Sequence, residues 1–384
     1  VIAIGLLPLS LWLFAQFSII SFVANSIAIP WIAIAVLPLC FLGILLLWVN
    51  PLLAKYVLLT ADKNLGMLWY VLDHLSKLPW ATWTQSIPHY GFVITSTIGI
   101  AILLLPKGFP GKLLGLFWLL PVLLFHPRIP GYGEAKFTLL DVGQGLSAVI
   151  QTRGHSLVFD TGAKFSAEHD MGENVVLPFL QHEKINKIDM LVISHADNDH
   201  SGGSFAILKK LPVNEIRTSV PYLYPGKASL CLAGLSWEWD GVTFTFFNPE
   251  FSQLNQGNNS SCVLMVRTQY GKILVPGDIE KEAEINLIEK YGHLLEADFL
   301  VAPHHGSKTS SQNEFVKMVS PKYVLYSTGY LNRYHFPHQQ VIDAYHTIRA
   351  VQYDTAALGA VTIYLNRKME GHLEYYARRS YYQE

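Results

Sequence analysis

The first fifty residues of this chain contain no aspartate, glutamate, lysine or arginine. Two apolar runs within them, Val1 to Ile20 and Ile27 to Val49, are each long enough to cross a lipid bilayer, which takes about 20 residues. We interpret the Asn25-Ser26 pair between the two runs as a short turn. Such a charge-free stretch predicts a membrane protein. The chain also starts with valine inside an apolar run, which indicates that an N-terminal part of the protein precedes it.

Residues 51–86 predict an amphipathic helix. Leu65, Leu68, Leu72 and Leu75 recur at helical spacing, and the charged residues of this stretch take other positions. Such a helix either lies on the membrane surface or packs on the transmembrane helices, and the sequence leaves both options open.

The topology follows from the loop between two shorter apolar runs, Phe92 to Leu105 and Leu113 to Phe125. Lys107 and Lys112 lie in this loop, and basic residues in short loops favour the cytoplasmic side of a membrane. We therefore expect a multi-pass protein of the cytoplasmic (inner) membrane. The chain would leave the membrane near Arg128, so that everything after it lies on the extracytoplasmic side.

Most of the charge of the chain lies after residue 130. Of the 28 basic and 29 acidic residues, 22 and 27 fall in residues 131–384, which gives this part a formal charge of −5. Together with the positive mean hydropathy of the whole chain, +0.27, this distribution predicts three parts: membrane helices over 1–128, a linker over 129–134 and a soluble domain over 135–384. The acidic balance argues against broad nucleic-acid binding by the soluble domain alone.

The soluble part alternates between short β-like runs and helical patterns. The expected strands are Lys136–Asp141, Leu146–Gln151, Ser156–Asp160, Met190–Ser194, Glu215–Ser219, Val242–Phe247, Val263–Thr268, Lys272–Val275, Phe299–Val301, Tyr323–Ser327 and Val361–Leu365. The expected helices are Ser204–Lys210, Lys281–Tyr291, Gln312–Val319 and Gln339–Thr347. This α/β (α+β) pattern predicts a four-layer αββα sandwich, although a doubly wound sheet would alternate in the same way.

Ligand-type side chains gather directly after the predicted strand Met190–Ser194. His195, Asp197, Asp199 and His200 follow it within six residues. Packing requires no such group at a strand end, whereas imidazole and carboxylate are the ligands that suit zinc, manganese or iron. The segment therefore predicts a divalent metal site.

Several motifs carry a family resemblance. The H-x-D-x-D-H of His195–His200 is similar to the first metal motif of the metallo-β-lactamase superfamily, which is usually H-x-H-x-D-H, with Asp197 in place of the second histidine. Four further motifs resemble the branch formed by the C-terminal domain of the ComEC family of DNA-internalisation competence proteins. These motifs are DVGQG at Asp141–Gly145, FDTG at Phe159–Gly162, HHGS at His304–Ser307 and NRYHFPH at Asn332–His338.

The membrane part extends this resemblance over essentially the whole chain, because its NSIAIP and VLPLCFLGILL runs resemble the last helices of the competence domain. The resemblance implies that single-stranded DNA passes through the membrane part during natural transformation. It also implies that the outward-facing domain hydrolyses the strand that is not imported. The implied partners are single-stranded DNA, the membrane and other proteins of the DNA-uptake machinery. Whether the protein also forms a homo-oligomer is left undecided by the sequence.

The remaining ligands of a two-metal site lie downstream. Asp278, at the end of the strand Lys272–Val275, is the candidate for a carboxylate shared by two ions, although alone it would be read as a helix cap. His304 and His305 follow the strand Phe299–Val301, and we favour His304 as the ligand because it lies at the strand end. The other histidine would then support a ligand from behind or contact a phosphate. The first ion would then have His195, Asp197, Asp278 and His304 as ligands, and the second Asp199, His200, Asp278 and His335.

Such a pair of ions would activate a water molecule and hold a phosphate between them. Asp199 would orient the attacking water, and His338 is either a general acid or a competitor of His335 for the second ion. Asp197 makes the first site more oxygen-rich than a three-histidine site, which shifts its preference toward manganese and leaves zinc possible.

Other residues are candidates for shaping the site. Asp141 and Gln144 would shape its mouth, and the Asp160 carboxylate would hold a ligand histidine from behind. Amide and hydroxyl donors to a phosphate are offered by Asn258, Asn259 and Ser261, which serve equally well as a hairpin turn. Further phosphate contacts are expected from Ser307 and Lys308, with Ser310 and Ser311 after them.

The predicted function is that of a metal-dependent phosphodiesterase, a deoxyribonuclease within a DNA-uptake channel. One alternative is a membrane-anchored phosphodiesterase acting on a cell-envelope polymer such as teichoic-acid phosphorylcholine, and another is a channel whose soluble domain is inactive. Asp197 and the HHG motif fit phosphate chemistry better than β-lactam hydrolysis. Cys231 and Cys262 would pair in an oxidising compartment, or both would stay unpaired.

Overall fold

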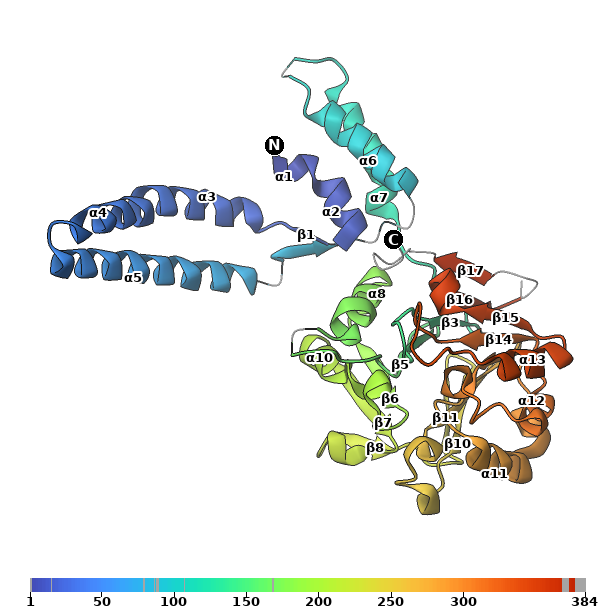
Figure 1. Cartoon of the computed structure of the whole chain (residues 1–384). Helices are drawn as coiled ribbons and strands as arrows, with labels where there is room; N and C mark the ends of the chain where they lie inside the picture. Colours follow the sequence, from blue (N-terminus) through green and yellow to red (C-terminus); the bar gives the residue numbers. More distant parts are fainter. Residues whose placement is uncertain are drawn as a thin grey trace. The chain divides into compact units, whose positions relative to one another are not determined.

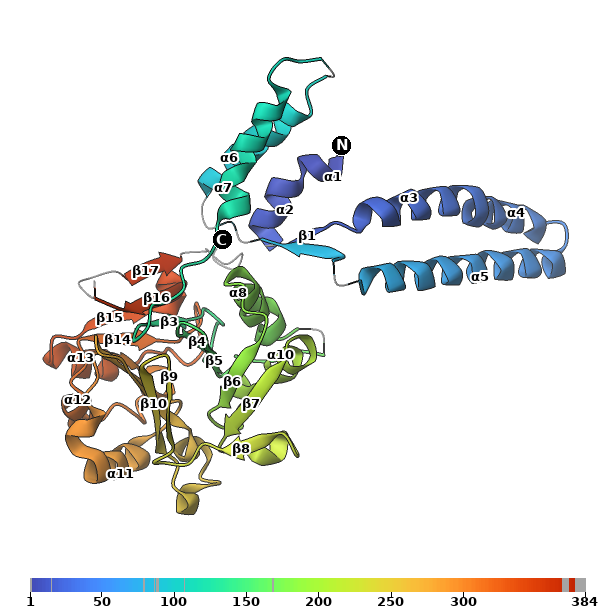
Figure 2. The ribbon, with the colours of Figure 1, turned by 180° about the vertical axis from the view of Figure 1, so that it is seen from behind.

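The computed structural model describes residues 2–14, 16–78, 80–85, 87, 90–106, 108–167, 169–367 and 373–376. Internal packing divides the chain into two compact units, which Figures 1 and 2 show from opposite sides. The helical unit contains Val1–Pro127 and Gln181–Lys184, and the sandwich unit contains Arg128–Leu180 and Ile185–Glu384.

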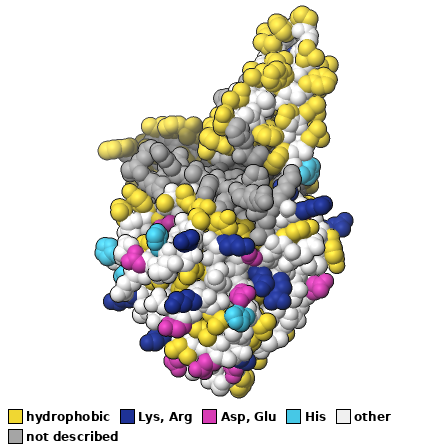
Figure 3. All heavy atoms as spheres, turned by 90° about the vertical axis from the view of Figure 1, so that its right-hand side faces the viewer, with side chains coloured by type: hydrophobic (Ala, Val, Ile, Leu, Met, Phe, Trp, Pro, Cys, Tyr) yellow, Lys and Arg dark blue, Asp and Glu magenta, His cyan; other side chains and the backbone are white. Residues whose placement is uncertain are grey.

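The helical unit consists almost entirely of helices with apolar surfaces. Its elements are α1 (Ile2–Gly5), α2 (Leu7–Phe14), β1 (Gln16–Ser18), α3 (Ser21–Trp31), η1 (Ile32–Val36), α4 (Leu37–Leu47), α5 (Pro51–Ser76), β2 (Thr82–Thr84), α6 (Tyr90–Leu103), η2 (Lys112–Leu114) and α7 (Gly115–Leu124). Hydrophobic side chains cover most of the helical surface that Figure 3 shows, whereas charged side chains are scattered over the sandwich unit.

The continuous helix Ser21–Leu47 is long and apolar enough to cross a membrane. Its 27 residues rise about 40 Å, which exceeds the ~30 Å hydrocarbon core of a bilayer. The helix predicted over Ile27–Val49 is thus confirmed, but the turn predicted at Asn25-Ser26 is wrong. Because the Ser26 hydroxyl donates to the Phe22 carbonyl at 2.7 Å, this polar side chain is satisfied inside the helix.

The span predicted over Val1–Ile20 is wrong as a single helix, and Val1 itself lies outside the described residues. α1 and α2 are separate short helices, and β1 then pairs antiparallel with β2. Pro8 accounts for the break, since it lacks the N–H that a continuous helix needs and its ring crowds the preceding turn.

The two later apolar runs form α6 and α7, which are shorter than a bilayer is thick: the 14 residues of α6 rise about 21 Å. Their backbones approach closely, because a Cβ on Gly99 would lie 2.7 Å from the carbonyl oxygen of Gly115. Of the two lysines used for the topology argument, Lys107 lies outside the described residues.

The amphipathic helix predicted over 51–86 is present as α5, which ends at Ser76. Its buried residues are Ala54, Ala61 and Leu68, spaced seven apart on one face. In addition, the side chain of Leu58 fills the space that a Cβ on Gly43 of α4 would occupy. Of the two options for this helix, the structure favours packing on another helix.

The sandwich unit contains two sheets, with the strand orders β17-β16-β3-β4-β5-β6-β7-β8 and β15-β14-β13-β12-β11-β10-β9. The first sheet is formed by β3 (Ala135–Leu139), β4 (Ala148–Gln151), β5 (Ser156–Phe159), β6 (Ile188–Ile193), β7 (Val213–Thr218), β8 (Ala228–Leu230), β16 (Ala360–Leu365) and β17 (Leu373–Tyr376). The second is formed by β9 (Ser236–Trp239), β10 (Val242–Asn248), β11 (Val263–Arg267), β12 (Lys272–Val275), β13 (Phe299–Val301), β14 (Tyr323–Tyr326) and β15 (Val351–Asp354).

The hydrophobic core lies between the two sheets, where Phe137, Phe159 and Met190 of the first pack with Phe244 and Leu264 of the second. Helices bury further clusters against the outer faces. On the first sheet these are α8 (Leu177–His182) and α10 (Ser204–Lys210); on the second they are α11 (Lys281–Tyr291), α12 (Asn313–Val319) and α13 (Gln339–Thr347). The predicted αββα sandwich is confirmed, and the doubly wound alternative is excluded by the second sheet.

The site is positioned by parallel strands. β5 and β6 run parallel in one sheet, as do β12, β13 and β14 in the other. Their carboxyl ends lead directly to Asp160, His195, Asp278, His304 and Ser327. Since the carboxyl ends of parallel strands share one edge of a sheet, the candidate residues gather at one end of the sandwich.

A disulfide bond between Cys231 and Cys262 joins the two sheets. Cys231 follows β8 and Cys262 precedes β11, and both are fully buried. The N–H of Cys262 donates to the carbonyl of Ser194 at 3.0 Å, next to the site. Of the two alternatives left open for these cysteines, pairing is the one found.

Candidate metal centre

Four side chains converge at the carboxyl ends of the strands. The ligand atoms of Asp199, His200, Asp278 and His305 all lie within 4.8 Å of one another. The Nε2 atoms of His200 and His305 are 3.2 Å apart. One Asp278 oxygen lies 3.1 Å from Nε2 of His200, and the other lies 3.4 Å from Nε2 of His305. Asp199 completes the group, 3.4 Å from Nε2 of His305.

Hydrogen bonds behind the two histidines fix their orientation. Nδ1 of His200 lies 2.7 Å from the carboxylate of Asp160, so Asp160 contacts one of the histidines that we expect to bind metal. Asp160 also accepts from the backbone N–H and the hydroxyl of Ser194, each at 2.7 Å. Nδ1 of His305 donates to the carbonyl of Ser327 at 2.9 Å. Both Nε2 atoms are thereby left to face the cluster.

The turn that carries His305 has an unusual backbone. His304, His305 and Gly306 have φ angles of 49°, 56° and 83°, which L-residues rarely adopt. The turn buries the His305 ring in the cluster and leaves His304 partly exposed, with its Nε2 3.8 Å from Asp278 and its Nδ1 3.3 Å from Glu280. We expected His304 to complete the ligands of the first ion with His195, Asp197 and Asp278; its Nε2 lies beside Asp278, whereas His305 lies among the four converging residues. The inward position of His305 could not be predicted, because sequence order after a strand does not fix side-chain direction in such a turn.

His195 and Asp197 form a pair beside the cluster. The ring of His195 is buried and its centroid lies 4.3 Å from that of His200. Its Nδ1 is 3.0 Å from the Ser194 hydroxyl, and its buried Nε2 has no hydrogen-bond partner among the described residues. The largely exposed Asp197 carboxylate lies 3.6 Å from this Nε2.

His335 and His338 do not lie among these four residues. His335 is exposed, and its backbone N–H donates to the carbonyl of Asn332 at 3.1 Å. His338 precedes α13, and its ring packs edge-on against Phe336 at 5.3 Å between centroids. The place that the sequence assigned to His335, beside Asp199 and His200, is occupied by His305.

The predicted substrate-binding residues divide into two groups. Asp141 and Gln144 belong to a loop that reaches the site, because the carbonyl of Gly145 accepts from the Ser327 hydroxyl at 2.6 Å. Ser261 is at the site as well: its hydroxyl accepts the N–H of Asp278 at 3.2 Å and lies 3.3 Å from Nδ1 of His195.

The second group stabilises turns. The Asn259 side chain accepts the N–H of Glu280 at 2.9 Å, and Asn258 belongs to the same short helical turn. The Ser307 hydroxyl lies 3.0 Å from that of Thr309, whereas Lys308 is exposed beside it. For Asn258 and Asn259 the structure favours the turn over the phosphate contact.

Charge couples the cluster tightly. Burial lowers the pKa of His200, but the carboxylates of Asp278 and Asp160 outweigh it and hold this pKa well above its ordinary value. Burial acts in the same way on His305, where Asp278 and Asp199 raise the pKa to about 9. The two imidazoles in turn overcome burial and lower the pKa of Asp199 to about 2, and that of Asp278 falls well below its ordinary value.

These residues fit a divalent cation. Two carboxylates and two imidazole nitrogens converge on one point, and a third imidazole, that of His195, has a buried Nε2 without a hydrogen-bond partner among the described residues. Nitrogen and oxygen donors of this kind suit zinc and manganese. The cluster supports divalent metal binding at the end of the sandwich.

Two contributors were missed at the level of the sequence. The first is the Ser327 carbonyl, which accepts a hydrogen bond from His305. Ser327 ends a predicted strand at the same sheet edge as the candidate ligands, and this position could have identified it from the sequence. The second is Glu280, which accepts from the Thr309 hydroxyl at 2.8 Å and lies against His304. Its position two residues after Asp278 could have identified it from the sequence.

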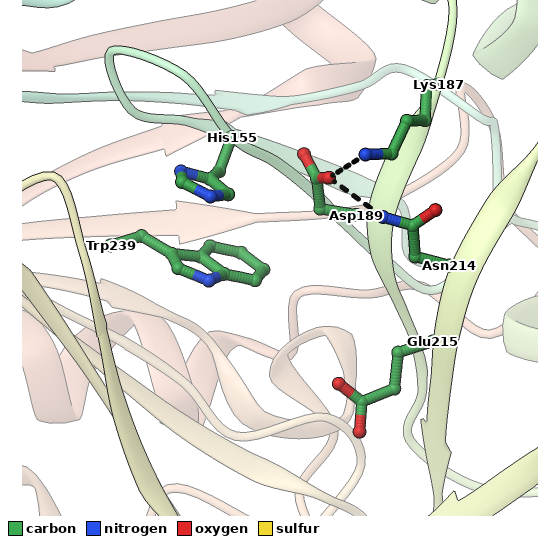
Figure 4. A pocket seen from close by; sticks show the side chains of 6 residues that line it. All are labelled: His155, Lys187, Asp189, Asn214, Glu215 and Trp239. Atoms are coloured by element: carbon green, nitrogen blue, oxygen red, sulfur yellow. Dashed lines mark hydrogen bonds and ion pairs between the residues drawn. The ribbon is translucent and has the colours of Figure 1, made fainter.

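The sandwich unit has a hollow of about 480 Å³ at the end of β6 that lies away from the metal cluster (Figure 4). The Asp189 carboxylate on its wall accepts from Lys187 at 2.9 Å and from Asn214 at 3.2 Å. His155 stacks on Trp239 with 4.9 Å between ring centroids. Because these groups are paired with one another, the hollow is a weaker candidate for a catalytic site than the cluster at the other end of β6.

The comparisons with known proteins agree with this division of the chain. Residues 1–110 match the model of the Competence protein family, and residues 140–330 match that of the metallo-beta-lactamase superfamily. Competence protein ComA of Neisseria gonorrhoeae is 34% identical over 86% of this chain and 46% of its own length. ComE operon protein 3 of Bacillus subtilis is 29% identical over 91% of this chain and 49% of its own length.

A more distant relative matches a smaller part. Ribonuclease J of Mycoplasma genitalium is 27% identical over 32% of this chain and 23% of its own length. The chain spans less than half the length of each of these relatives.

Proposed function

Because the chain belongs to the competence proteins in which a Competence domain is followed by a metallo-beta-lactamase domain, we propose that its sandwich unit is a phosphodiesterase that hydrolyses single-stranded DNA. The helical unit would belong to an inner-membrane DNA-uptake channel, and the strand hydrolysed would be the one that is not imported. The observation that carries this proposal is the convergence of ligand atoms within 4.8 Å of one another, from the buried His200, Asp278 and His305 and from Asp199 at their edge.

The chemistry is assigned to these residues as follows. Divalent ions bound here, manganese or zinc, would supply the Lewis acidity that activates water and neutralises charge on a phosphate. His200 and His305 present Nε2 because Asp160 and Ser327 hold their Nδ1 atoms. Asp278 contacts both imidazoles from the opposite side and holds them at a common point.

We propose two ions. The first would be held by the four-residue cluster. The second would be held by His195, Asp197 and His304, of which His195 lies beside His200, Asp197 beside His195 and His304 beside Asp278. Asp199, which is a third exposed, would orient the attacking water. The roles of His335 as a ligand and of His338 as a general acid stay predictions, since both lie outside the cluster.

The disulfide supports an extracytoplasmic place for the sandwich unit, because such bonds persist in oxidising compartments. The boundary between the two compact units at Pro127 and Arg128 supports membrane helices over 1–128, a linker over 129–134 and a hydrolase domain over 135–384. The relative named as a ribonuclease supports a nucleic-acid phosphodiester as substrate rather than a β-lactam.

The test is cleavage of a labelled single-stranded oligonucleotide by the whole chain in detergent micelles, with manganese or with zinc. We expect a chelator to stop cleavage, and Asp278→Asn to lower it at least about 100-fold, since loss of this carboxylate weakens metal binding. Asp343→Asn, which changes an exposed carboxylate on α13, is the matched control and should cleave normally.

Two results would contradict the proposal. One is a folded, metal-loaded chain that cleaves no DNA. The other is hydrolysis of a phosphorylcholine ester in place of DNA, which would support the cell-envelope alternative.

A further inference from the structure

A row of stacked rings leads outward from the metal cluster. The ring of Phe336 lies nearly parallel to that of His305, at 20° and 6.4 Å between centroids. Tyr334 stacks on Phe336 at 21° and 5.4 Å. The Arg333 guanidinium caps the row, 4.8 Å from the centre of the Tyr334 ring. The four side chains form a continuous path from a candidate metal ligand to the surface.

The loop that carries this row, residues 329–338, is exposed and free of acidic residues. Tyr330, Leu331 and Tyr334 are 53%, 84% and 45% exposed. The ten residues GYLNRYHFPH include one arginine and two histidines but no aspartate or glutamate, in a part of the chain that holds most of the acidic residues. Exposed aromatic rings beside a cation, on a segment without acidic residues, favour an anionic partner with flat apolar faces.

The loop is also rigidly built. The Asn332 side chain bridges it, accepting the N–H of Phe336 at 2.9 Å and donating to the carbonyls of Phe336 and Gly329 at 2.8 and 3.1 Å. The backbone of His338 donates to the carbonyl of Gly306 at 3.0 Å, which ties the loop to the turn that carries His305. A Cβ on Gly306 would lie 2.7 Å from Pro337, so the two segments are in direct contact.

We propose that residues 329–338 form a stacking platform for the bases of a single-stranded nucleic acid, which seats its backbone at the metal cluster. When the strand binds, one base takes the face of Tyr334 that the Arg333 guanidinium covers in this structure, and Arg333 moves to the neighbouring phosphate. The inference rests on the proposed function and adds to it the way the strand is held. Single strands are selected because a duplex hides the faces of its bases, and any sequence is accepted because every base has such a face.

The platform explains how an acidic domain holds an anionic polymer. Its formal charge of −5 gives no general attraction for DNA. Base stacking is not electrostatic, and the local cations Arg333 and Lys308 lie on the two segments that border the cluster.

The test measures binding without hydrolysis. The whole chain, in detergent and with a chelator present, is titrated with a fluorescent twelve-residue oligothymidylate, with an abasic strand of the same length and with a duplex, and anisotropy is recorded. We expect the oligothymidylate to bind more tightly than both other ligands. Tyr334→Ala should weaken its binding about tenfold and leave the abasic strand unchanged, since stacking on one ring is lost.

Matched variants make the result specific. Tyr334→Phe keeps the ring and should bind like the wild type, as should Tyr222→Ala, which removes a tyrosine that is 64% exposed elsewhere on the sandwich unit. Arg333→Gln should weaken the oligothymidylate and the abasic strand alike and reduce the dependence on salt. Unchanged metal binding by Tyr334→Ala would verify that the variant is folded.

The platform is refuted if Tyr334→Ala binds oligothymidylate like the wild type, or if it loses the abasic strand equally. Binding that depends on Tyr334 in a chain that hydrolyses no DNA would contradict the proposed function and leave the platform standing. Hydrolysis of DNA by a chain whose oligothymidylate binding is unchanged by Tyr334→Ala would refute the platform and leave the proposed function standing.

Discussion

His305 enters the cluster because of the backbone that carries it. Three consecutive residues with positive φ, His304 to Gly306, turn the chain so that neighbouring rings separate, one inward and one toward solvent. Backbone conformations of this kind are maintained by the surrounding structure and concentrate at functional sites. Here the support comes from the Ser327 carbonyl on one side and Pro337 on the other.

A second residue-scale constraint lies at Gly145, and it yields a prediction. A Cβ on Gly145 would lie 2.4 Å from the carbonyl oxygen of Asp199, and the φ angle of +141° disfavours any side chain. We expect Gly145→Ala to displace Asp199 and His200 and to weaken metal binding about 10- to 100-fold. Isothermal titration of the whole chain with manganese measures this.

Gly143→Ala provides the control for backbone strain. Gly143 also has a positive φ, +71°, but a Cβ there would meet nothing within 4 Å. Equal losses of metal affinity in the two variants would show that strain in the loop, and not the contact with Asp199, is responsible.

At the scale of elements, the sequence predicts the fold well where apolar runs are long. Every strand and helix predicted for the sandwich unit is present within two residues of its expected bounds. The strands β8, β9, β15 and β17 were not predicted, and these four are the edge strands of the two sheets. β8, β9 and β15 are short or alternately exposed, so burial leaves little pattern in their sequences.

The candidate site was predictable in composition but not in arrangement. Strand ends identified the segments around His195, Asp278 and His304, because topology brings such ends together. The choice between His304 and His305 depends on turn geometry, and the distance of His335 from the cluster depends on how its loop folds. Neither the turn geometry nor the fold of the loop can be predicted from the spacing of residues in the sequence.

The contact between α11 and α12 gives a prediction about pH. Glu284 of α11 is fully buried and accepts the N–H groups of Ser311 and Gln312, at 2.5 and 2.9 Å, where α12 begins. Burial raises its pKa from 4.5 to about 7. Since the folded state then binds this proton more tightly than the unfolded state, its contribution to stability is full below about pH 4.5 and is lost as the pH rises through about 7.

We therefore expect the free energy of unfolding of the wild type to fall by up to about 3 kcal/mol between pH 5 and pH 8, relative to Glu284→Gln, which does not titrate. Urea unfolding at both pH values, followed by tryptophan fluorescence, measures the difference. Glu282→Gln, an exposed neighbour on α11, should track the wild type. The same pH dependence in Glu284→Gln as in the wild type would assign the effect to another group.

The disulfide gives a second prediction between elements. It closes a loop with a sequence separation of 31 residues and joins the two sheets beside the cluster. We expect its removal by Cys231→Ala and Cys262→Ala together to lower the free energy of unfolding by about 3 kcal/mol. A reductant should destabilise the wild type by a similar amount and leave the double variant unchanged.

Cys40→Ala, which removes the one free cysteine described, is the control for thiol chemistry and should respond to the reductant like the wild type. Thiol labelling provides the opposing outcome: two reactive thiols at Cys231 and Cys262 in the unfolded, unreduced chain would contradict the bond.

At the scale of the whole molecule, the chain joins a helical unit with a lipid-compatible surface to a hydrolase-type sandwich. The site uses residues from Asp160 to Ser327, so it requires both sheets to be complete and correctly paired. All residues of the site belong to the sandwich unit, so the site is assembled within one unit. The membrane helices and the hydrolase are thus separable in structure and joined in the proposed function.

Asp199, His200, Asp278 and His305 are proposed to hold a divalent metal ion together. The direct measurement is manganese binding to the whole chain by titration calorimetry, compared between His305→Ala and His335→Ala. We predict that His305→Ala loses at least about tenfold in affinity, because it removes a buried ligand, whereas His335→Ala binds like the wild type. Full binding by His305→Ala together with loss of binding by His335→Ala would contradict this account.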